Sequence, residues 1–382
     1  MLELLFLLLP IAAAYGWYMG KRSTRINQQR SSESLSKNYF EGLNFLLSDQ
    51  PDKAVDRFIE LLQVDSETFD THLSLGNLFR KRGEVDRSIR IHQNLIARPS
   101  LSLAQKDMAM MELAKDYLAA GLFDRAEEIL LQLVKDPDHS DEAEKQLLSV
   151  YQATKEWWKA IHLVKRFKRA RRKQLAPQVA HFYCQLAQES KSEKEQQDFW
   201  LQALKQDECC GRAYLAQFDL ACEQRRFNDA ITALGSIAQL APEWFAETLP
   251  RAQQPFTETQ RRDEYAELLQ LVLEKQPSAT VTLALAETMA PEQAEQMILA
   301  HLKRQPTMKG FHRLMQLHAD AMASESSRDS LMLLSDLVGK QIRLRPKYRC
   351  IQCGFPGHSL YWHCPSCKSW GQIQRIQGLD GD

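Results

Sequence analysis

The residues best suited to chemistry are four cysteines near the end of the chain. Cys350 and Cys353 form one Cys-x-x-Cys pair, and Cys364 and Cys367 form a second pair ten residues further on. Each pair places two sulfurs on one tight turn, and two such turns can face each other as a tetrahedral thiolate cage. A cage of this kind selects zinc or a single iron over harder cations. The spacing therefore predicts one metal ion, iron or zinc, and the alternative is a pair of disulfides.

The other end of the chain decides between these two interpretations. Residues 2–19 are almost wholly apolar, which is close to the minimum length that spans a bilayer core of roughly 30 Å. A cleaved signal peptide requires positively charged residues before its apolar segment. No Lys or Arg precedes this run. Four basic residues follow it, namely Lys21, Arg22, Arg25 and Arg30. We therefore predict an uncleaved transmembrane anchor over 1–20, with a cleaved signal peptide or a soluble apolar tail as alternatives.

The basic residues after the apolar run also predict a compartment. By the positive-inside rule the bulk of the chain lies on the cytoplasmic side of a membrane. Thiols stay reduced there, which favours metal ligands over disulfides at the four cysteines. The remaining cysteines lack ligand spacing and are interpreted as packing residues, with the adjacent Cys209 and Cys210 as a potentially reactive exception. These four are Cys184, Cys209, Cys210 and Cys222.

Composition indicates a helical protein without a nucleic-acid signature. The 49 basic and 49 acidic residues balance, so no global field attracts nucleic acid, and none is expected as a partner. Gly and Pro are sparse in the 382 residues, and helix-forming residues dominate. Residues 21–37 are polar and are predicted to form a linker.

The middle of the chain is a repeat. Five anchor positions are each followed by a small residue twelve positions on and by a mostly large residue sixteen positions on. The anchors are Gly42, Gly76, Ala114, Leu148 and Phe218. The small residues are Ala54, Ser88, Ala126, Ala160 and Ala230. The large residues are Phe58, His92, Leu130, Val164 and Leu234.

This pattern resembles the tetratricopeptide repeat, a helix–turn–helix unit of roughly 34 residues. Its best copies begin at Leu73 and Met111, whereas the unit near Ala187 departs from it because Phe199 replaces the small residue. The resemblance implies an all-α superhelical solenoid over 38–305, whose stacked units offer an extended protein-binding surface. The units after Phe245 are degenerate, and connecting helices are expected over 306–345.

No catalytic motif accompanies the repeat. A phosphate-binding loop, an H-E-x-x-H helix and a G-x-S-x-G elbow are all missing from the sequence, so we do not expect an enzyme. His92, His162 and His181 are explained by packing or by the surface. His358 and His363 flank the cysteines and are alternative ligands or hydrogen-bond partners of the ligands.

The densest charge run is 165–173, with seven basic residues in nine. It is interpreted as a contact for anionic lipid headgroups, for an acidic partner or for nucleic acid, or as a solvated helix and loop. No aromatic stacking platform accompanies it, which disfavours RNA.

Residues 346–382 are predicted to form a small metal-binding domain that resembles rubredoxin. A module this small needs the metal for much of its folding free energy. Its ten-residue spacer is much shorter than that of rubredoxins, which disfavours electron transfer. We expect a structural or docking role in which aromatic side chains cover the metal and pack on the array. These are Tyr348, Phe355, Tyr361, Trp362 and Trp370.

The order of these parts, with the segments 1–10 and 348–355 at the two ends, resembles the lipopolysaccharide assembly protein B family of Gram-negative inner membranes. The resemblance implies a non-enzymatic, single-pass adaptor. With the membrane protease FtsH it would promote degradation of LpxC, the deacetylase that commits carbon to lipid A, and it would link lipopolysaccharide synthesis to export. It also implies Cys350, Cys353, Cys364 and Cys367 as metal ligands. A redox or thiol protein and a general membrane scaffold are the alternatives, and homo-oligomerisation is left open.

Overall fold

The computed structural model describes residues 19, 44–45, 53 and 69–382, and the chain divides into two compact units between Glu156 and Trp157. The predicted anchor over 1–20 and linker over 21–37 lie outside the described residues except for Met19, and the repeat unit that starts at Gly42 lies largely outside them. Within the described part of the chain, no helix combines the length and the apolar character needed to cross a bilayer.

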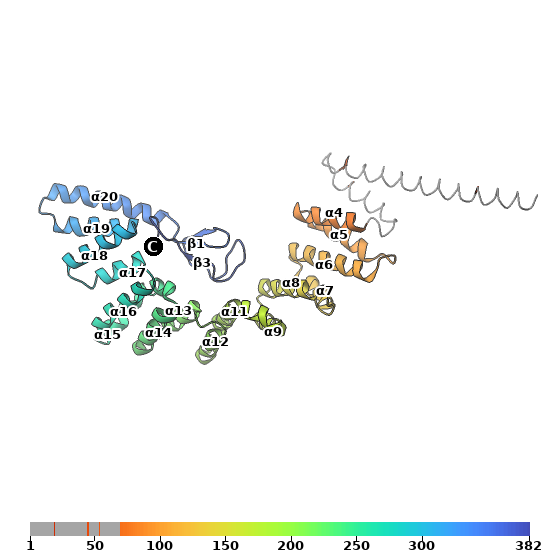
Figure 1. Cartoon of the computed structure of the whole chain (residues 1–382), viewed down its shortest axis with the longest axis horizontal. Helices are drawn as coiled ribbons and strands as arrows, with labels where there is room; N and C mark the ends of the chain where they lie inside the picture. Colours follow the sequence, from red (N-terminus) through yellow and green to blue (C-terminus); the bar gives the residue numbers. More distant parts are fainter. Residues whose placement is uncertain (1–18, 20–43, 46–52, 54–68) are drawn as a thin grey trace, which may run out of the picture. The chain divides into compact units, whose positions relative to one another are not determined.

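The first unit is built from antiparallel helix pairs. Its described helices are α4 (Phe69–Lys81), α5 (Val85–Ile96), α6 (Leu103–Ala119), α7 (Phe123–Leu133) and α8 (Ser140–Ala153) (Figure 1). Ser102 begins α6 with a capping box, in which its hydroxyl accepts from the Gln105 amide while the Gln105 side chain accepts from the Ser102 amide. This reciprocal cap fixes where the second pair starts.

The second unit is also built from packed helices, and it ends in a small sheet. Its helices are α9 (Trp157–Arg166), α10 (Arg169–Gln174), α11 (Ala176–Glu189), α12 (Glu193–Gln206), α13 (Gly211–Glu223), α14 (Phe227–Leu240), the 3₁₀ helix η2 (Pro242–Glu247), α15 (Leu249–Glu258), α16 (Arg262–Lys275), α17 (Ala279–Ala286), α18 (Pro291–Arg304), α19 (Met308–Ala321) and α20 (Glu325–Leu344). Helices α19 and α20 pack against each other, and α19 also packs on α17 and α18. The helical stack therefore runs on through residue 344.

The all-α repeat fold is confirmed by what lies between the paired helices. The small repeat residues Ser88, Ala126, Ala160 and Ala230 have no exposed surface. The anchors and the large residues sixteen positions on are also buried wherever the structure describes them. In the divergent unit, helices α11 and α12 still pair, and Ala203 is the fully buried small residue while Phe199 is only half-buried.

His92 is buried as predicted, but it belongs to a polar network and not to an apolar seam. Its Nδ1 lies 2.5 Å from one carboxylate oxygen of Asp116, and the Ser88 hydroxyl donates to the other oxygen at 2.6 Å. Arg80 also donates to Asp116, at 2.7 Å. Because these groups satisfy one another, they can be buried between α4, α5 and α6 without unpaired charge.

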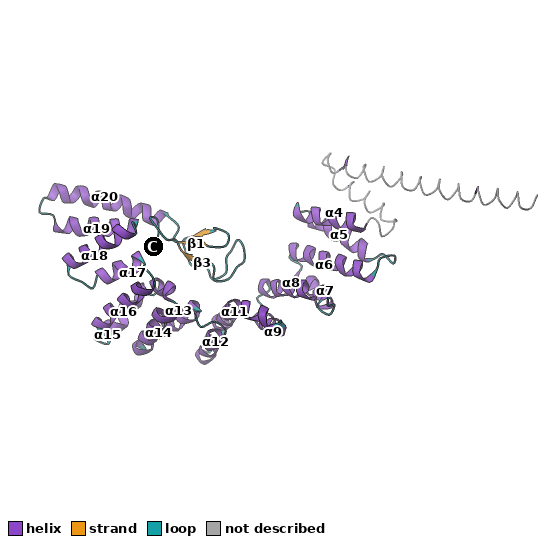
Figure 2. Ribbon diagram, viewed as in Figure 1, coloured by secondary structure: helices purple, strands orange, loops and turns teal. Residues whose placement is uncertain are grey.

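The chain ends in a small antiparallel sheet (Figure 2). Its strands are β1 (Tyr348–Cys350), β2 (Pro356–Gly357) and β3 (Ile373–Arg375), in the order β2-β1-β3. Cys350 lies opposite Ile373 in the β1–β3 ladder. The helices of the second unit curve around this sheet (Figure 1).

Candidate metal centre

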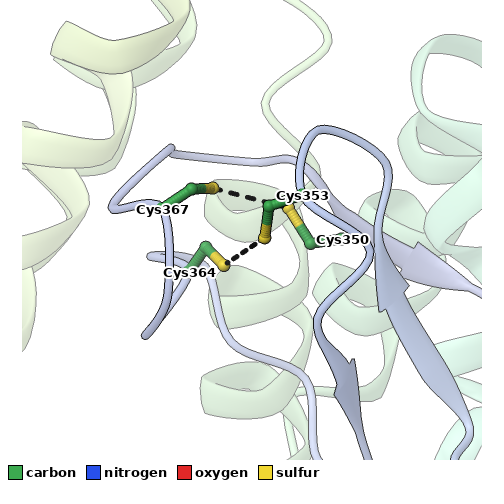
Figure 3. Close-up of side chains that lie close together, drawn as sticks. All are labelled: Cys350, Cys353, Cys364 and Cys367. Carbon is green, nitrogen blue, oxygen red and sulfur yellow. Dashed lines mark hydrogen bonds between the residues drawn. The ribbon is translucent and has the colours of Figure 1, made fainter.

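The four predicted cysteines come together at one point. Their sulfurs all lie within 4.8 Å of one another. The Sγ atoms of Cys350 and Cys367 are 3.7 Å apart, and so are those of Cys353 and Cys364 (Figure 3). Each of these short distances joins a cysteine of the first Cys-x-x-Cys pair to a cysteine of the second pair. The four sulfurs can therefore surround one metal ion.

The two knuckles share one backbone design. The residue after the second cysteine has a positive φ in each, +79° at Gly354 and +59° at Lys368. Its amide donates back to the carbonyl of the first cysteine, at 2.8 Å from Gly354 to Cys350 and at 3.0 Å from Lys368 to Cys364. Glycine adopts this backbone conformation freely, whereas lysine does so at a cost.

Backbone hydrogen bonds also hold the residues around each knuckle. The Ile351 amide donates to the Gln372 carbonyl at 2.8 Å, and the Cys364 amide donates to the Ser369 carbonyl at 2.8 Å. In each knuckle the first cysteine is buried and the second is more exposed. Tyr348 and Ile373 complete the small core on the buried side.

Hydrogen bonds to sulfur prepare Cys367 and Cys350 for the thiolate form that a metal needs. The Ser369 hydroxyl and amide lower the pKa of Cys367 to about 6. Burial acts to raise the pKa of Cys350, but hydrogen bonds from the Cys353 and Gln352 amides outweigh it, so that the pKa falls. Burial raises the pKa of Cys364 to about 11. A bound metal cation would stabilise the Cys364 thiolate against this effect of burial.

The sulfur positions fit a tetrahedral metal site. With a Zn–S bond of about 2.3 Å, a regular tetrahedron has S···S edges of about 3.8 Å, close to the 3.7 Å of the two closest sulfur pairs. A disulfide requires about 2.05 Å between sulfurs, and all eight cysteines are free thiols. The donor set of four sulfurs suits zinc or iron.

Neither flanking histidine belongs to this ligand group. In the described part of the chain the cluster consists of the four cysteines. His358 is exposed, and His363 stacks on Trp370 with ring centroids 4.4 Å apart. His363 therefore supports the fold of the second knuckle through ring contact.

Two tryptophans attach the metal-binding domain to the helical array. Trp370 packs edge-on against Trp157 of α9 and Phe182 of α11, at centroid distances of 5.9 Å and 5.7 Å. Trp362 contacts Trp244 of η2 at 4.6 Å. Five aromatic residues are predicted from the sequence to cover the metal and pack on the array. One of them, Tyr361, is 44% exposed.

Polar contacts reinforce this attachment, and no motif in the sequence predicts them. Glu247 of η2 accepts from the Tyr348 hydroxyl at 2.8 Å and from Arg375 Nε at 2.6 Å. The Asp382 carboxylate accepts from the Ser278 hydroxyl at 3.0 Å and from the Thr280 amide at 2.8 Å. These contacts fix β1, β3 and the last residue against η2 and α17.

The remaining residues singled out in the sequence lie apart from the metal centre. Cys184 and Cys210 are buried with their sulfurs 4.0 Å apart, Cys222 is buried and Cys209 is exposed. The basic run over 165–173 ends α9 and forms α10, and most of its charged side chains are exposed. His162 is exposed on α9.

Comparison with known proteins identifies the family. A family model described as the rubredoxin metal binding domain matches residues 348–375. Lipopolysaccharide assembly protein B of Escherichia coli (strain K12) is 43% identical over 389 residues, covering 100% of both chains. The chain belongs to the lipopolysaccharide assembly protein B family. The family member from Haemophilus influenzae is 38% identical over 394 residues, again covering 100% of both chains.

Solved structures add no further argument. A structure of PilF from Pseudomonas aeruginosa is 16% identical and covers 60% of this chain and 98% of that chain, with a TM-score of 0.28. A TM-score this low does not support a shared fold, so the fold assignment depends on the helices described above. The rubredoxin-type domain and its four clustered cysteines support a single metal ion in this family member.

Proposed function

We propose that this chain is a non-enzymatic adaptor in lipopolysaccharide biosynthesis at the bacterial inner membrane. The observation that carries the proposal is the 43% identity to lipopolysaccharide assembly protein B across the full length of both chains. The helical array and the docked metal-binding domain fit this role, because stacked repeats offer extended surfaces for proteins. The chemistry-bearing residues gather at a metal knuckle that is attached to the array, which suits a structural centre.

In this proposal Cys350, Cys353, Cys364 and Cys367 hold one iron or zinc ion. The ion supplies a cross-link between the two knuckles and with it folding free energy that a sheet of this size lacks. The chain's own residues do the rest. Ser369 donates to Cys367, and the strand β1 fixes Cys350 opposite β3.

The adaptor works with an FtsH-type membrane protease and promotes proteolysis of an LpxC-type deacetylase. A single-pass anchor over 1–20 would hold the array beside the protease, with the bulk of the chain on the cytoplasmic side. Confinement to one membrane raises the effective concentration of the partners without any new contact. Lipopolysaccharide export proteins are further candidate partners.

The experiment is deacetylase turnover in cells that carry the chain as their only family member. We compare the wild type with Cys350→Ser/Cys364→Ser and with Cys209→Ser, an exposed cysteine outside the metal centre. The ligand variant is expected to lengthen the half-life of the deacetylase, and the control to leave it unchanged. Co-purification of the protease and the deacetylase with each chain shows whether binding is lost.

The redox alternative makes the opposite prediction. If deacetylase turnover followed reversible oxidation of the metal centre, and a redox-silent metal abolished it, the adaptor role would have to be given up. Equal turnover with zinc and with iron in the site supports the structural role.

A further inference from the structure

A large hollow lies between the last helices of the array and the metal-binding domain. Its volume is about 720 Å³, within the range of small-molecule pockets. Leu249 of α15, Leu283 of α17 and Ile342 of α20 form an apolar wall, and Tyr348 and Arg375 close it from the sheet side. We call this hollow the basic pocket.

Cations dominate the lining of the basic pocket. Six lining residues are Lys or Arg, and three are acidic. The six cations are Lys309, Arg313, Arg343, Arg345, Lys347 and Arg375. The three carboxylates are Glu247, Glu287 and Asp380. This excess of positive charge sits in a chain whose charges otherwise balance.

Three of the cations are neutralised by nearby carboxylates. Arg375 pairs with Glu247 at 2.6 Å, and Arg345 pairs with Asp380. Lys309 lies 3.4 Å from the carboxylate of Asp382, which is itself buried beside the pocket. These pairs belong to the attachment of the metal-binding domain and are not available to a ligand.

The other three cations remain uncompensated. Arg313 of α19, Arg343 of α20 and Lys347 form no ion pair with any carboxylate in the described residues, and Arg313 bonds only the neutral Gln316. Glu287 is the one lining carboxylate left without a cation among the described residues. When Asp382 beside the pocket is counted with the three lining carboxylates, six cations face four carboxylates, which leaves about two net positive charges.

Lining cations also act on the pKa of two groups in the pocket wall, beside the larger effect of burial. Burial lowers the pKa of His312, and Arg343 and Arg313 lower it further, against an opposing effect of Asp336. Burial also lowers the pKa of Lys309, where Arg375 and Lys347 add to it while Asp382 opposes. His312 and Lys309 each therefore lie near two of the lining cations.

We propose that the basic pocket binds a phosphate monoester. A phosphate monoester carries close to two negative charges and matches the uncompensated charge, whereas one carboxylate would balance only half of it. Two guanidinium groups suit the several acceptor oxygens of a phosphate. The apolar wall accommodates the rest of the ligand. A soluble phosphate ester and a lipid phosphate headgroup share this chemistry.

Ligand binding is coupled to docking of the metal-binding domain, because the pocket is complete only when the sheet closes it. A ligand that binds the docked form alone stabilises that form by mass action. This inference does not depend on the proposed adaptor function, since it concerns binding to the purified chain.

The experiment is calorimetric titration of the purified full-length chain with three probes. These are inorganic phosphate, glucose 1-phosphate and micellar dioctanoyl phosphatidic acid. Arg313→Gln/Arg343→Gln is expected to weaken binding about tenfold or more, since two charge-assisted contacts are lost. Lys340→Gln is the matched control, because Lys340 is an exposed cation on α20 outside the lining. It should leave affinity within about twofold, and salt should weaken wild-type binding.

The probes separate the two sources of phosphate. Binding of glucose 1-phosphate identifies a soluble ester, and binding of phosphatidic acid alone identifies a lipid headgroup. Hydrogen exchange should slow within 309–313 and 342–347 when the probe is bound. If the double variant loses its metal or its helicity, Lys347→Gln replaces it, because the Lys347 side chain is exposed. The proposal is overturned if no probe binds the wild type at millimolar concentration, or if the pocket variants bind as tightly as the wild type.

Discussion

A single buried histidine links the stability of the second unit to pH. His181 of α11 stacks on Trp370 at 5.5 Å and lies near Trp362 at 5.7 Å, so the metal-binding domain covers it. Burial, with smaller effects of Arg212 and His363, lowers its pKa to about 3. The imidazole is therefore neutral in the folded protein, and its Nδ1 has no hydrogen-bond partner in the described residues.

The predicted consequence is a loss of stability between pH 6.5 and pH 3. In this window the unfolded chain binds a proton at His181 that the folded chain does not, so stability falls as pH falls, by roughly 1.4 kcal/mol per pH unit. Above pH 6.5 the effect vanishes. Urea denaturation of the wild type and His181→Gln at several pH values should show a shallower profile for the variant. His162→Gln, at an exposed position, is the control, and parallel profiles for the wild type and His181→Gln would refute the assignment.

A glycine at the same contact gives a second prediction. Gly371 has a φ of +64°, and a Cβ there would lie 2.8 Å from Nε2 of His181. Gly378 also has a positive φ, +93°, but a Cβ there meets nothing within 4 Å. Both alanine variants therefore carry backbone strain of about 1–2 kcal/mol. Gly371→Ala should cost a further 1–3 kcal/mol or so from overpacking against His181.

Chemical denaturation of both variants measures the difference directly. Fluorescence of the tryptophans should also shift in Gly371→Ala, because Trp370 is displaced from Trp157 and Phe182. Equal losses of stability in the two variants would mean that the contact with His181 adapts without cost.

At the scale of elements, the repeat and the knuckles could be predicted from sequence because both have a fixed local spacing. The small residues at Ser88 and Ala126 repeat with the helix pairs, and Cys-x-x-Cys specifies a turn. The attachment of the domain could not be predicted. Glu247 meets Tyr348 across 101 positions and Arg375 across 128, so no period or motif connects them.

His92 shows the same limit within one repeat unit. Its position in the pattern predicted burial, and it is buried. Its polar partner Asp116 lies on α6, 24 residues later, and no spacing rule indicates that a carboxylate enters the seam there. Patterns of residue size locate the interior, but a pairing between charges on successive helices depends on the packed geometry.

Asp382 is the element-scale anchor that can be tested. Burial opposes its charged form, but Lys309, Thr280 and Arg375 outweigh burial and lower its pKa. Asp382→Ala leaves the Ser278 hydroxyl without its acceptor and Lys309 without its counter-charge inside the interface, which should cost about 2–4 kcal/mol. Asp380→Ala removes a neighbouring carboxylate whose pair with Arg345 is exposed, and it should cost less than about 1 kcal/mol.

Denaturation midpoints with metal present test this pair of variants. The stability that Asp382 contributes is expected at neutral pH and should be lost as pH falls through its lowered pKa. Equal midpoints for the two variants would show that the end of the chain does not hold the domain in place.

At the scale of the whole molecule, we expect the metal-binding domain to fold together with the helices of residues 157–382. The sheet buries little apolar surface of its own, and its tryptophans complete the surfaces of α9, α11 and η2. The ion proposed at the four cysteines would therefore stabilise helices that contain no ligand. Those helices all lie within residues 157–382, so the helices described in residues 69–156 should not depend on it.

This dependence predicts a local pattern of hydrogen exchange after metal loss. In Cys350→Ser/Cys364→Ser, amides of the sheet should exchange fast because the knuckles no longer fold. Amides of α11 and of η2 should exchange faster as well, since Phe182 and Trp244 lose their cover, whereas α4–α7 should exchange at the wild-type rate. Cys209→Ser should leave all segments unchanged, because this exposed cysteine is not a ligand. Fast exchange confined to the sheet, with unchanged α11 and η2, would show that the array folds independently of its metal-binding domain and that docking contributes nothing to its stability.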